Sequence, residues 1–184
     1  ALLDAWLSQL EPAGAEPIRI AAALESAEGL FRAAEIARSS PRLTAILFGG
    51  GDLSGQIGCP LAWEPMLHAR HTVVLAATLA GVDALDVPYL DVEDDRGLEE
   101  EARRVAQLGF RGKVVIHPRQ IATVNAVFTP SSDELAWAER VLAAARKQGT
   151  GAIRLDGKMI DLAVIKRAER IAAVAQRTPK SLEG

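Results

Sequence analysis

The sequence has few cysteines, little net charge and no long apolar run. It contains one cysteine, Cys59, in 184 residues, which excludes an internal disulfide framework and fits a reducing compartment. A formal net charge of −3 gives no overall attraction to nucleic acid or to an anionic membrane. The apolar stretches are too short to span a bilayer, and the first residues do not form a signal-peptide pattern. We therefore expect a cytoplasmic protein that binds neither nucleic acid nor membrane.

Apolar segments that alternate with amphipathic segments predict a parallel sheet covered by helices. The expected strands cover residues 18–24, 43–48, 84–89 and 113–116, and the expected helices between them cover residues 27–39, 65–80 and 98–108. Each strand–helix unit has about 30 residues, which fits a (β/α)₈ barrel, but a complete barrel needs roughly 250 residues. The pattern alone leaves an open doubly wound sheet and part of a closed barrel as alternatives. In both, chemistry lies at the carboxyl ends of the strands.

Two acidic residues follow consecutive expected strands. Glu25 closes the first, and Asp52 follows the second after three glycines. Buried carboxylates need a compensating charge, and neither strand offers a Lys or Arg at that end. Two carboxylates leave room for water and substrate oxygens around Mg²⁺, which prefers oxygen ligands. We therefore predict a magnesium site. The alternatives are that Glu25 caps a helix and that Asp52 lies in a solvated turn.

The glycine run at residues 49–51 could bring backbone amides close to an anion. It lacks the spacing of a dinucleotide site and the Gly-Lys-Ser/Thr of a P-loop. We expect these amides to hold the carboxylate of a small acid while Asp52 holds the metal. The alternative is that the glycines only allow a tight turn from strand to helix.

Further polar residues follow the other two expected strands. Asp86 could contact the metal ligands without binding the metal itself. His117 precedes Pro118, which restricts its backbone. A lone histidine in this position is more often a positioned or ligand-contacting group than a metal ligand. The segment after residue 131 predicts a helix to about residue 148, capped by Ser132 or Asp133, a hairpin with an Asp-Gly turn, and a helix over residues 162–177. Asp161 is a natural cap for that last helix.

Five segments together resemble the citrate lyase β-subunit-like branch of the aldolase/citrate lyase superfamily, and the resemblance covers nearly the whole chain. These segments are residues 24–27 (LESA), 51–53 (GDL), 109–121 (GFRGKVVIHPRQI), 128–131 (FTPS) and 156–161 (DGKMID). The resemblance implies a TIM barrel with C-terminal extensions that reach a neighbouring subunit in a homotrimer or hexamer. It implies that residues 1–130 form the C-terminal part of such a barrel, without its first strands. Residues 131–184 would then form the helix-hairpin-helix extension.

The resemblance also implies an activity. Members of the family use Mg²⁺ to make or break carbon–carbon bonds between a keto acid or acetyl unit and a CoA or carrier-protein thioester. By resemblance, Glu25 and Asp52 are the metal ligands, and Asp161 is the acid/base that a neighbouring subunit delivers. The amides around Gly51, Asp52 and Leu53 would bind the substrate carboxylate. Cleavage would pass through an enolate, which a cation and a proton donor stabilise.

Two departures from the family pattern leave other functions open. Many relatives have an acidic residue where this chain has Gly51, and the substrate-binding arginine of the family's early strands has no counterpart here. The rivals to a metal-dependent lyase are therefore a non-catalytic or carrier-dependent β-subunit of a citrate lyase-type complex, and a folded fragment whose function is assembly through its hairpin.

Overall fold

The computed structural model describes residues 2–148 and 153–177, so the first residues of the expected hairpin and the end of the chain lie outside the described residues. The chain divides into two compact units, Ala1–Phe128 and Thr129–Gly184. Among the described residues, no helix is both long and apolar enough to cross a membrane.

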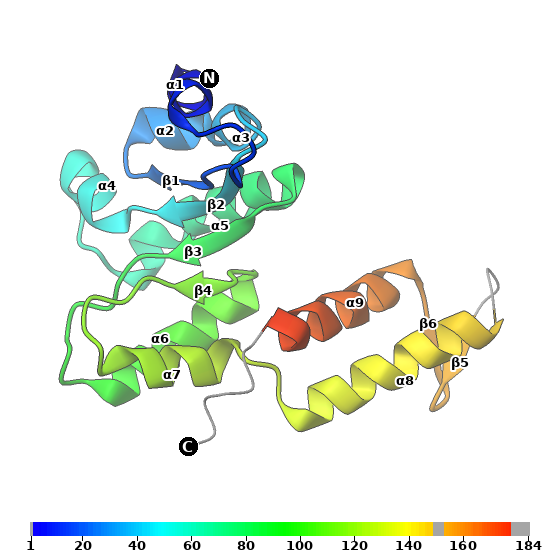
Figure 1. Cartoon of the computed structure of the whole chain (residues 1–184). Coiled ribbons are helices and arrows are strands. Elements are labelled where there is room, and N and C mark those ends of the chain that lie inside the picture. Colours follow the sequence, from blue (N-terminus) through cyan, green and yellow to red (C-terminus); the bar gives the residue numbers. More distant parts are fainter. Residues whose placement is uncertain (1, 149–152, 178–184) are drawn as a thin grey trace. The chain divides into compact units, whose positions relative to one another are not determined.

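The first unit is built on a parallel sheet whose strands follow one another in chain order (Figure 1). Its strands are β1 (Ile20–Leu24), β2 (Leu43–Phe48), β3 (Asp83–Asp86) and β4 (Gly112–Lys113). Sequential parallel strands with right-handed crossovers carry all their helices on one face, whereas a doubly wound sheet reverses its strand order. The described strands are therefore wound in one direction, as in a segment of a barrel.

The last two strands are shorter than the sequence predicts. We expected a strand to run through residues 84–89, but β3 ends at Asp86. Pro88 has no backbone N–H, so it cannot donate to a sheet ladder. The last backbone bond between these strands joins Val114 N to Asp86 O at 2.9 Å. Beyond it, the two segments have no ladder to hold them together.

The helices of this unit are α1 (Leu2–Leu10), α2 (Ala27–Phe31), α3 (Ala33–Ala37), α4 (Gly50–Ile57), α5 (Trp63–Ala80), α6 (Asp95–Leu108) and α7 (Gln120–Phe128). The single helix expected over residues 27–39 is wrong. It is broken at Arg32, whose φ of −103° and ψ of 14° leave the helical region. The break places the small side chains of Ala33 and Ala37 in the core, where both are buried.

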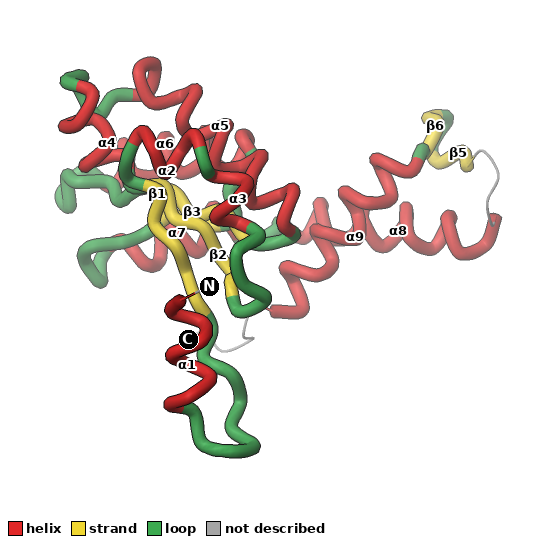
Figure 2. Tube along the Cα trace, turned by 90° about the horizontal axis from the view of Figure 1, so that it is seen from above, coloured by secondary structure: helices red, strands yellow, loops and turns green. Residues whose placement is uncertain are grey.

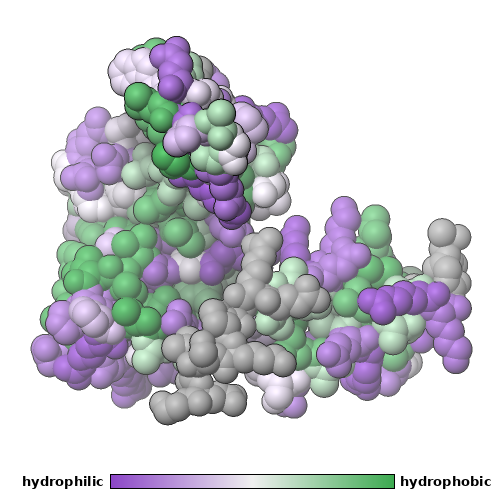
Figure 3. Space-filling model, in the orientation of Figure 1, coloured by the Kyte–Doolittle hydropathy of each residue, from purple (hydrophilic) through white to green (hydrophobic). Residues whose placement is uncertain are grey.

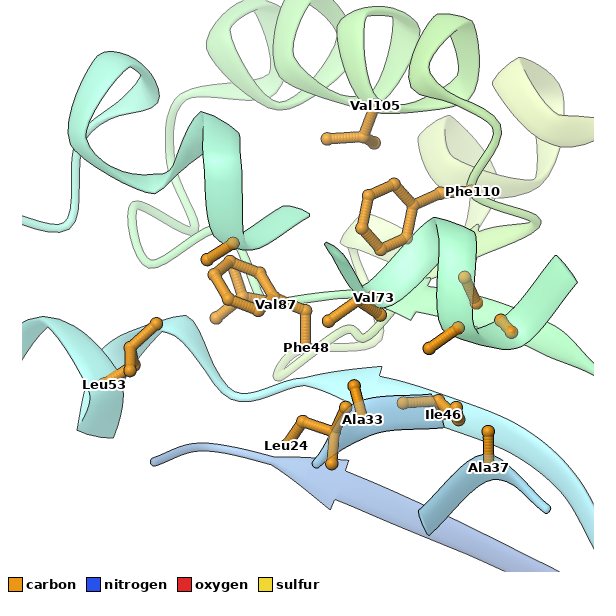
Figure 4. Packing of buried hydrophobic residues seen from close by; sticks show 14 of the residues in the cluster. Leu24, Ala33, Ala37, Ile46, Phe48, Leu53, Val73, Val87, Val105 and Phe110 are labelled. Atoms are coloured by element: carbon orange, nitrogen blue, oxygen red, sulfur yellow. The ribbon is translucent and has the colours of Figure 1, made fainter. Parts of the chain in front are cut away.

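The two faces of the sheet differ in burial. On one face Leu24, Ile46 and Phe48 are buried and belong to the same core cluster as Met66 and Val73 of α5 (Figure 4). Side chains of alternate residues point to the other face, where they are exposed or only half-buried: Ala21, Ala23, Ala45, Leu47 and Leu85. Apolar surface is visible in this unit in Figure 3. One face is therefore packed under helices and the other is open.

Helix α1 is held by polar contacts, and it lies apart from the helices that cover the sheet (Figure 2). None of its residues is buried. The Arg42 side chain, at the start of β2, bonds Asp4 Oδ1 at 2.6 Å, Ser8 Oγ at 3.0 Å and Glu11 Oε1 at 2.6 Å. The guanidinium of Arg42 also holds the pKa of the Glu11 carboxyl below its ordinary value. One arginine thus fastens α1 and the turn after it.

The second unit is a helix, a hairpin and a helix: α8 (Ser132–Gln148), β5 (Ile153–Leu155), β6 (Lys158–Ile160) and α9 (Leu162–Arg177). Its core contains Ala138, Val141, Ile160 and Ala168. The hairpin turns at Asp156 and Gly157, with φ of 51° and 76°. Two consecutive positive φ values are typical of the turn that an Asp-Gly pair favours.

The cap of α8 differs from the expected Ser132 or Asp133. Ser131 Oγ accepts the Glu134 amide at 3.2 Å, and Glu134 Oε2 accepts the Ser131 amide at 2.9 Å. This reciprocal pair is a capping box. Helix α8 therefore begins at Ser132, one residue earlier than a cap at Ser132 would allow, because Glu134 completes the capping box with Ser131.

Candidate active site

Glu25 and Gly49 lie side by side where β1 and β2 end. Leu24 pairs with Phe48 in the parallel register, and the Gly49 amide donates to Leu24 O at 2.9 Å. A Cβ on Gly49 would lie 2.3 Å from Glu25 Cβ and 2.9 Å from Glu25 Cα. Only glycine allows the two chains to approach this closely. The glycine therefore sets the place of the glutamate.

Asp52 lies in the first turn of α4, which begins at Gly50. The glycine run is therefore the start of a helix and not only a turn. The first amide bonded back along the helix is that of Leu53, which donates to Gly49 O at 3.2 Å. The amides of Gly50, Gly51 and Asp52 precede that bond and lie at the positive end of the helix dipole. This end of α4 can hold an anion such as a carboxylate.

Gln56, which the sequence analysis did not single out, connects α4 to the segment after β1. Its Oε1 accepts the Ala27 amide at 2.7 Å. Ser26 Oγ accepts the Gly29 amide at 3.1 Å and caps α2, so the cap of this helix is Ser26 and not Glu25. Glu25 thus precedes a helix that another residue caps, which leaves its carboxylate available.

Both predicted metal ligands are exposed, which corrects the expectation that they are buried. The open face of the sheet leaves the carboxyl ends of β1 and β2 in contact with solvent. No hydrogen bond or ion pair joins the carboxylates of Glu25 or Asp52 to another described residue. Among the described residues, three or more His, Cys, Asp or Glu side chains do not gather where they could hold a metal. Two carboxylates with water fit Mg²⁺, which is often bound through one or two protein carboxylates.

Asp86 at the end of β3 is fully buried between two cations. Its Oδ1 accepts from Arg70 Nε at 2.9 Å, and its Oδ2 accepts from Lys113 Nζ at 2.8 Å. The same ammonium group donates to Glu101 Oε1 at 2.6 Å and to Val87 O at 2.7 Å. Asp86 therefore faces the helix side of the sheet, and its charge is neutralised there.

Arg70 is 2% exposed and stacks on two aromatic rings. Its guanidinium carbon lies 5.5 Å from the centre of the Phe48 ring and 4.9 Å from that of Trp63. Aromatic faces attract such a cation most strongly when it is removed from water. Arg70 Nη1 has no hydrogen-bond partner among the described residues. The sequence analysis missed this arginine, because no local signal links residue 70 to residue 86.

The other predicted site residues lie in different surroundings. His117 is exposed beyond the carboxyl end of β4. Leu53 is 2% exposed, and its amide already donates to Gly49 O at 3.2 Å. Asp161 is exposed in the second unit, where its Oδ1 accepts the Val164 amide at 2.9 Å and caps α9. Glu25, Asp52 and His117 share the carboxyl edge of one parallel sheet.

The loop after β3 carries a bonded Tyr89–Asp94 pair. Tyr89 donates its hydroxyl to Asp94 Oδ2 at 2.7 Å, and the Gly97 amide donates to Asp94 Oδ1 at 2.8 Å. The Gly97 amide, followed by the Tyr89 hydroxyl, holds the pKa of the Asp94 carboxyl below its ordinary value. The bond to Asp94 raises the pKa of Tyr89 to about 12. The pair fixes the loop and the start of α6.

Sequential parallel strands with polar side chains at their carboxyl edge define an α/β protein built on a parallel sheet. The family model of the HpcH/HpaI aldolase/citrate lyase matches residues 10–118. Citramalyl-CoA lyase of Mus musculus, a mitochondrial protein, is 37% identical over 173 residues, which are 87% of this chain and 51% of that protein. Citrate lyase subunit beta of Leuconostoc mesenteroides subsp. cremoris is 35% identical over 94% of this chain and 60% of its own length. This chain therefore belongs to the HpcH/HpaI aldolase/citrate lyase family.

A solved relative carries ligands of the expected kind. The structure of CitE from Mycobacterium tuberculosis, in complex with magnesium, acetoacetate and coenzyme A, superposes with a TM-score of 0.72 at 38% identity. The match covers 94% of this chain and 65% of that one. The chain spans between about half and two thirds of the length of these relatives. Cytoplasmic location stays a prediction.

Proposed function

We propose that this chain carries the metal-binding part of a magnesium-dependent carbon–carbon lyase that acts on a malyl-, citramalyl- or citryl-type thioester. The observation that carries the proposal is the pair of exposed, uncompensated carboxylates of Glu25 and Asp52 beside the first turn of α4. Relatives at 35–37% identity are named for lyases of this kind, and a solved relative holds magnesium, acetoacetate and coenzyme A. We further propose that the open sheet is part of a TIM barrel.

Glu25 and Asp52 would hold the ion, and water and substrate oxygens would complete its ligands. Magnesium bound there would stabilise the negative oxygens that develop when the carbon–carbon bond breaks. The amides of Gly50, Gly51 and Asp52 would hold the carboxylate of the keto acid through the helix N-terminus. Leu53 would contribute by fixing this end of α4, because its side chain is in the core and its amide donates to Gly49 O at 3.2 Å.

Asp161 of a neighbouring copy would exchange a proton with the methyl carbon of the thioester. Its carboxylate is exposed and accepts a backbone amide through one oxygen, which leaves the other oxygen free for a ligand. We therefore propose a homotrimer or hexamer in which the second unit of one copy completes the site of another.

The test is a set of single substitutions assayed in the whole protein with Mg²⁺ and the three thioesters. Glu25→Ala and Asp52→Ala should each lower Mg²⁺ affinity at least about tenfold, since substitutions of groups that only support metal ligands already cost 10- to 100-fold. Glu64→Ala is the matched control, because Glu64 is an exposed acid in the first turn of α5. Full activity and Mg²⁺ affinity in both variants would overturn the site.

The shared site has its own test. Asp161→Ala and Asp52→Ala subunits should each be inactive alone, and mixed oligomers should regain activity, because some sites then contain both intact residues. If mixing restores nothing, the two residues do not act across subunits.

A second candidate function is that of a β-subunit that acts only on a carrier-bound acyl thioester inside a larger complex. The Leuconostoc relative, named as a citrate lyase subunit, favours this alternative. Turnover of acyl-carrier thioesters with no turnover of the CoA thioesters would select it.

A further inference from the structure

Two side chains continue the connection between β3 and β4 after the backbone ladder ends. Lys113 Nζ donates to Val87 O at 2.7 Å. Gln120 Nε2 donates to Tyr89 O at 2.8 Å. The carbonyls at positions 87 and 89 thus receive side-chain donors on either side of Pro88. These contacts hold the loop after β3 against the loop after β4.

Gln120 also binds the loop after β4. Its side-chain Oε1 accepts the Ile116 amide at 3.0 Å, and its backbone N–H donates to His117 O at 3.0 Å. The residue is 1% exposed, so an amide left without partners there would be costly. Both polar atoms of the side chain are used, so the side chain fixes the backbone directly before His117, and the Gln120 backbone amide holds the His117 carbonyl.

The ring of His117 is oriented by a local bond. Its Nδ1 accepts the Arg119 amide at 3.2 Å, so the neutral ring carries its proton on Nε2. Arg119 is itself held by Glu93 and Asp95, at 2.7 Å and 2.9 Å. No described residue accepts from Nε2, and the ring is exposed. The turn thus presents a donor on the edge of the sheet that carries Glu25 and Asp52.

We infer that Gln120 is a positioning residue that holds His117 as an outward Nε2–H donor, and that this donor binds an oxygen of the thioester substrate. The inference rests on the proposed function for the identity of the ligand. A purely local role for His117 explains the Nδ1 contact and leaves Nε2 without a use. Gln120 is matched to both loops at once, which a residue that only fills the core would not require.

The substitutions at His117 separate the two roles of its ring. Asn can replace the Nδ1 contact, since its side-chain oxygen accepts the amide two residues on, but it cannot reach outward as Nε2 does. We expect His117→Asn to keep the unfolding midpoint and to lose about 100- to 1,000-fold in kcat/KM, as loss of a donor to developing negative oxygen does. Gln extends further and carries an N–H, so His117→Gln should recover part of the loss.

The effect of substitutions at Gln120 is measured by ¹⁵N NMR, which reports the tautomer of the His117 ring. This measurement does not depend on enzyme activity. The wild-type ring should show one tautomer with the proton on Nε2, and Gln120→Met should give a mixture. If Gln120→Met does not fold, Gln120→Asn replaces it, because the shorter amide cannot span both loops. Gln107→Met, at an exposed glutamine of α6, is the matched control and should change nothing.

The outcomes distinguish this inference from the proposed function. Titration with Mg²⁺ and acetyl-CoA should shift the Nε2 signal even in a protein that turns over none of the three thioesters. An unchanged tautomer in the Gln120 variants would overturn the positioning role. Wild-type kcat/KM in His117→Asn, or no Nε2 shift with acetyl-CoA, would overturn the donor role.

Discussion

The carboxylates at the two halves of the sheet differ in burial and in charge pairing. At β3 and β4, Asp86 is fully buried and shares its charge with Arg70 and Lys113. At β1 and β2, Glu25 and Asp52 are exposed, and no described residue is paired with them. A carboxylate that is already neutralised has little attraction left for an added ion. Asp86 therefore serves stability, whereas Glu25 and Asp52 are available to bind a ligand.

The largest effect should come from breaking the buried half. Asp86→Asn removes the buried anion between Arg70 and Lys113 and leaves them only Glu101, so we expect a loss of about 3–5 kcal/mol in the free energy of unfolding. Asp52→Asn is the matched substitution in the exposed half and should change stability by less than about 0.5 kcal/mol. Urea unfolding of both variants measures the contrast. Equal losses would remove the distinction between the halves.

A smaller effect should come from crowding the exposed half. Gly49→Ala forces a Cβ against Glu25, and we expect a loss of about 1–3 kcal/mol, as overpacking usually costs. Mg²⁺ affinity should fall with it, because Glu25 must move. Gly51→Ala is the control for stability. A Cβ there would meet no other segment of the described chain within 4 Å, and alanine favours the helix. A stable Gly49→Ala protein with intact Mg²⁺ affinity would show that the close approach does not place Glu25.

Asp161 is an intermediate case, since it is exposed but bonded to the helix that it caps. Asp161→Ala should destabilise the protein by about 0.5–2 kcal/mol through loss of the cap. Asp161→Asn keeps a capping oxygen and should keep stability, yet it removes the acid and should abolish lyase turnover. Thermal unfolding and activity, measured on both variants, divide the two roles. If Asp161→Asn turns over normally, Asp161 is only a cap.

The smallest effect should be a pH dependence in the loop after β3. The folded-state pKa of Asp94 is lowered, so its contribution to stability is present above its ordinary pKa and is lost as pH falls through the folded value. The stability difference between wild type and Asp94→Asn should therefore be constant near neutral pH and shrink in acid. Urea unfolding at a series of pH values measures it.

The sequence predicted the elements better than their contacts. The bounds of β2 and α9 match the expected ranges, because a continuous apolar run and a clear N-cap are local signals. The edge that carries Glu25, Asp52 and His117 also follows from the strand order. The coarse family assignment is confirmed by the matched family model.

Other features depend on residues that are far apart in the sequence. The partner of Asp86 on α5 is 16 positions away, and that on β4 is 27 positions away. A usable signal was nevertheless present, because Asp86 and Lys113 are charged residues inside apolar segments and end neighbouring strands. The exposure of Glu25 could not be predicted, because it depends on which face of the sheet is covered.

The attachment of α1 has a consequence for local stability. Moderate salt weakens ion pairs more than it weakens hydrophobic burial, although partly buried pairs such as those of Arg42 are weakened less than exposed ones. Because Arg42 holds α1 by charge and no α1 residue is buried, this helix should open before the sheet does. A rise in ionic strength would then detach α1 from the first unit while the sheet and its covering helices stay folded.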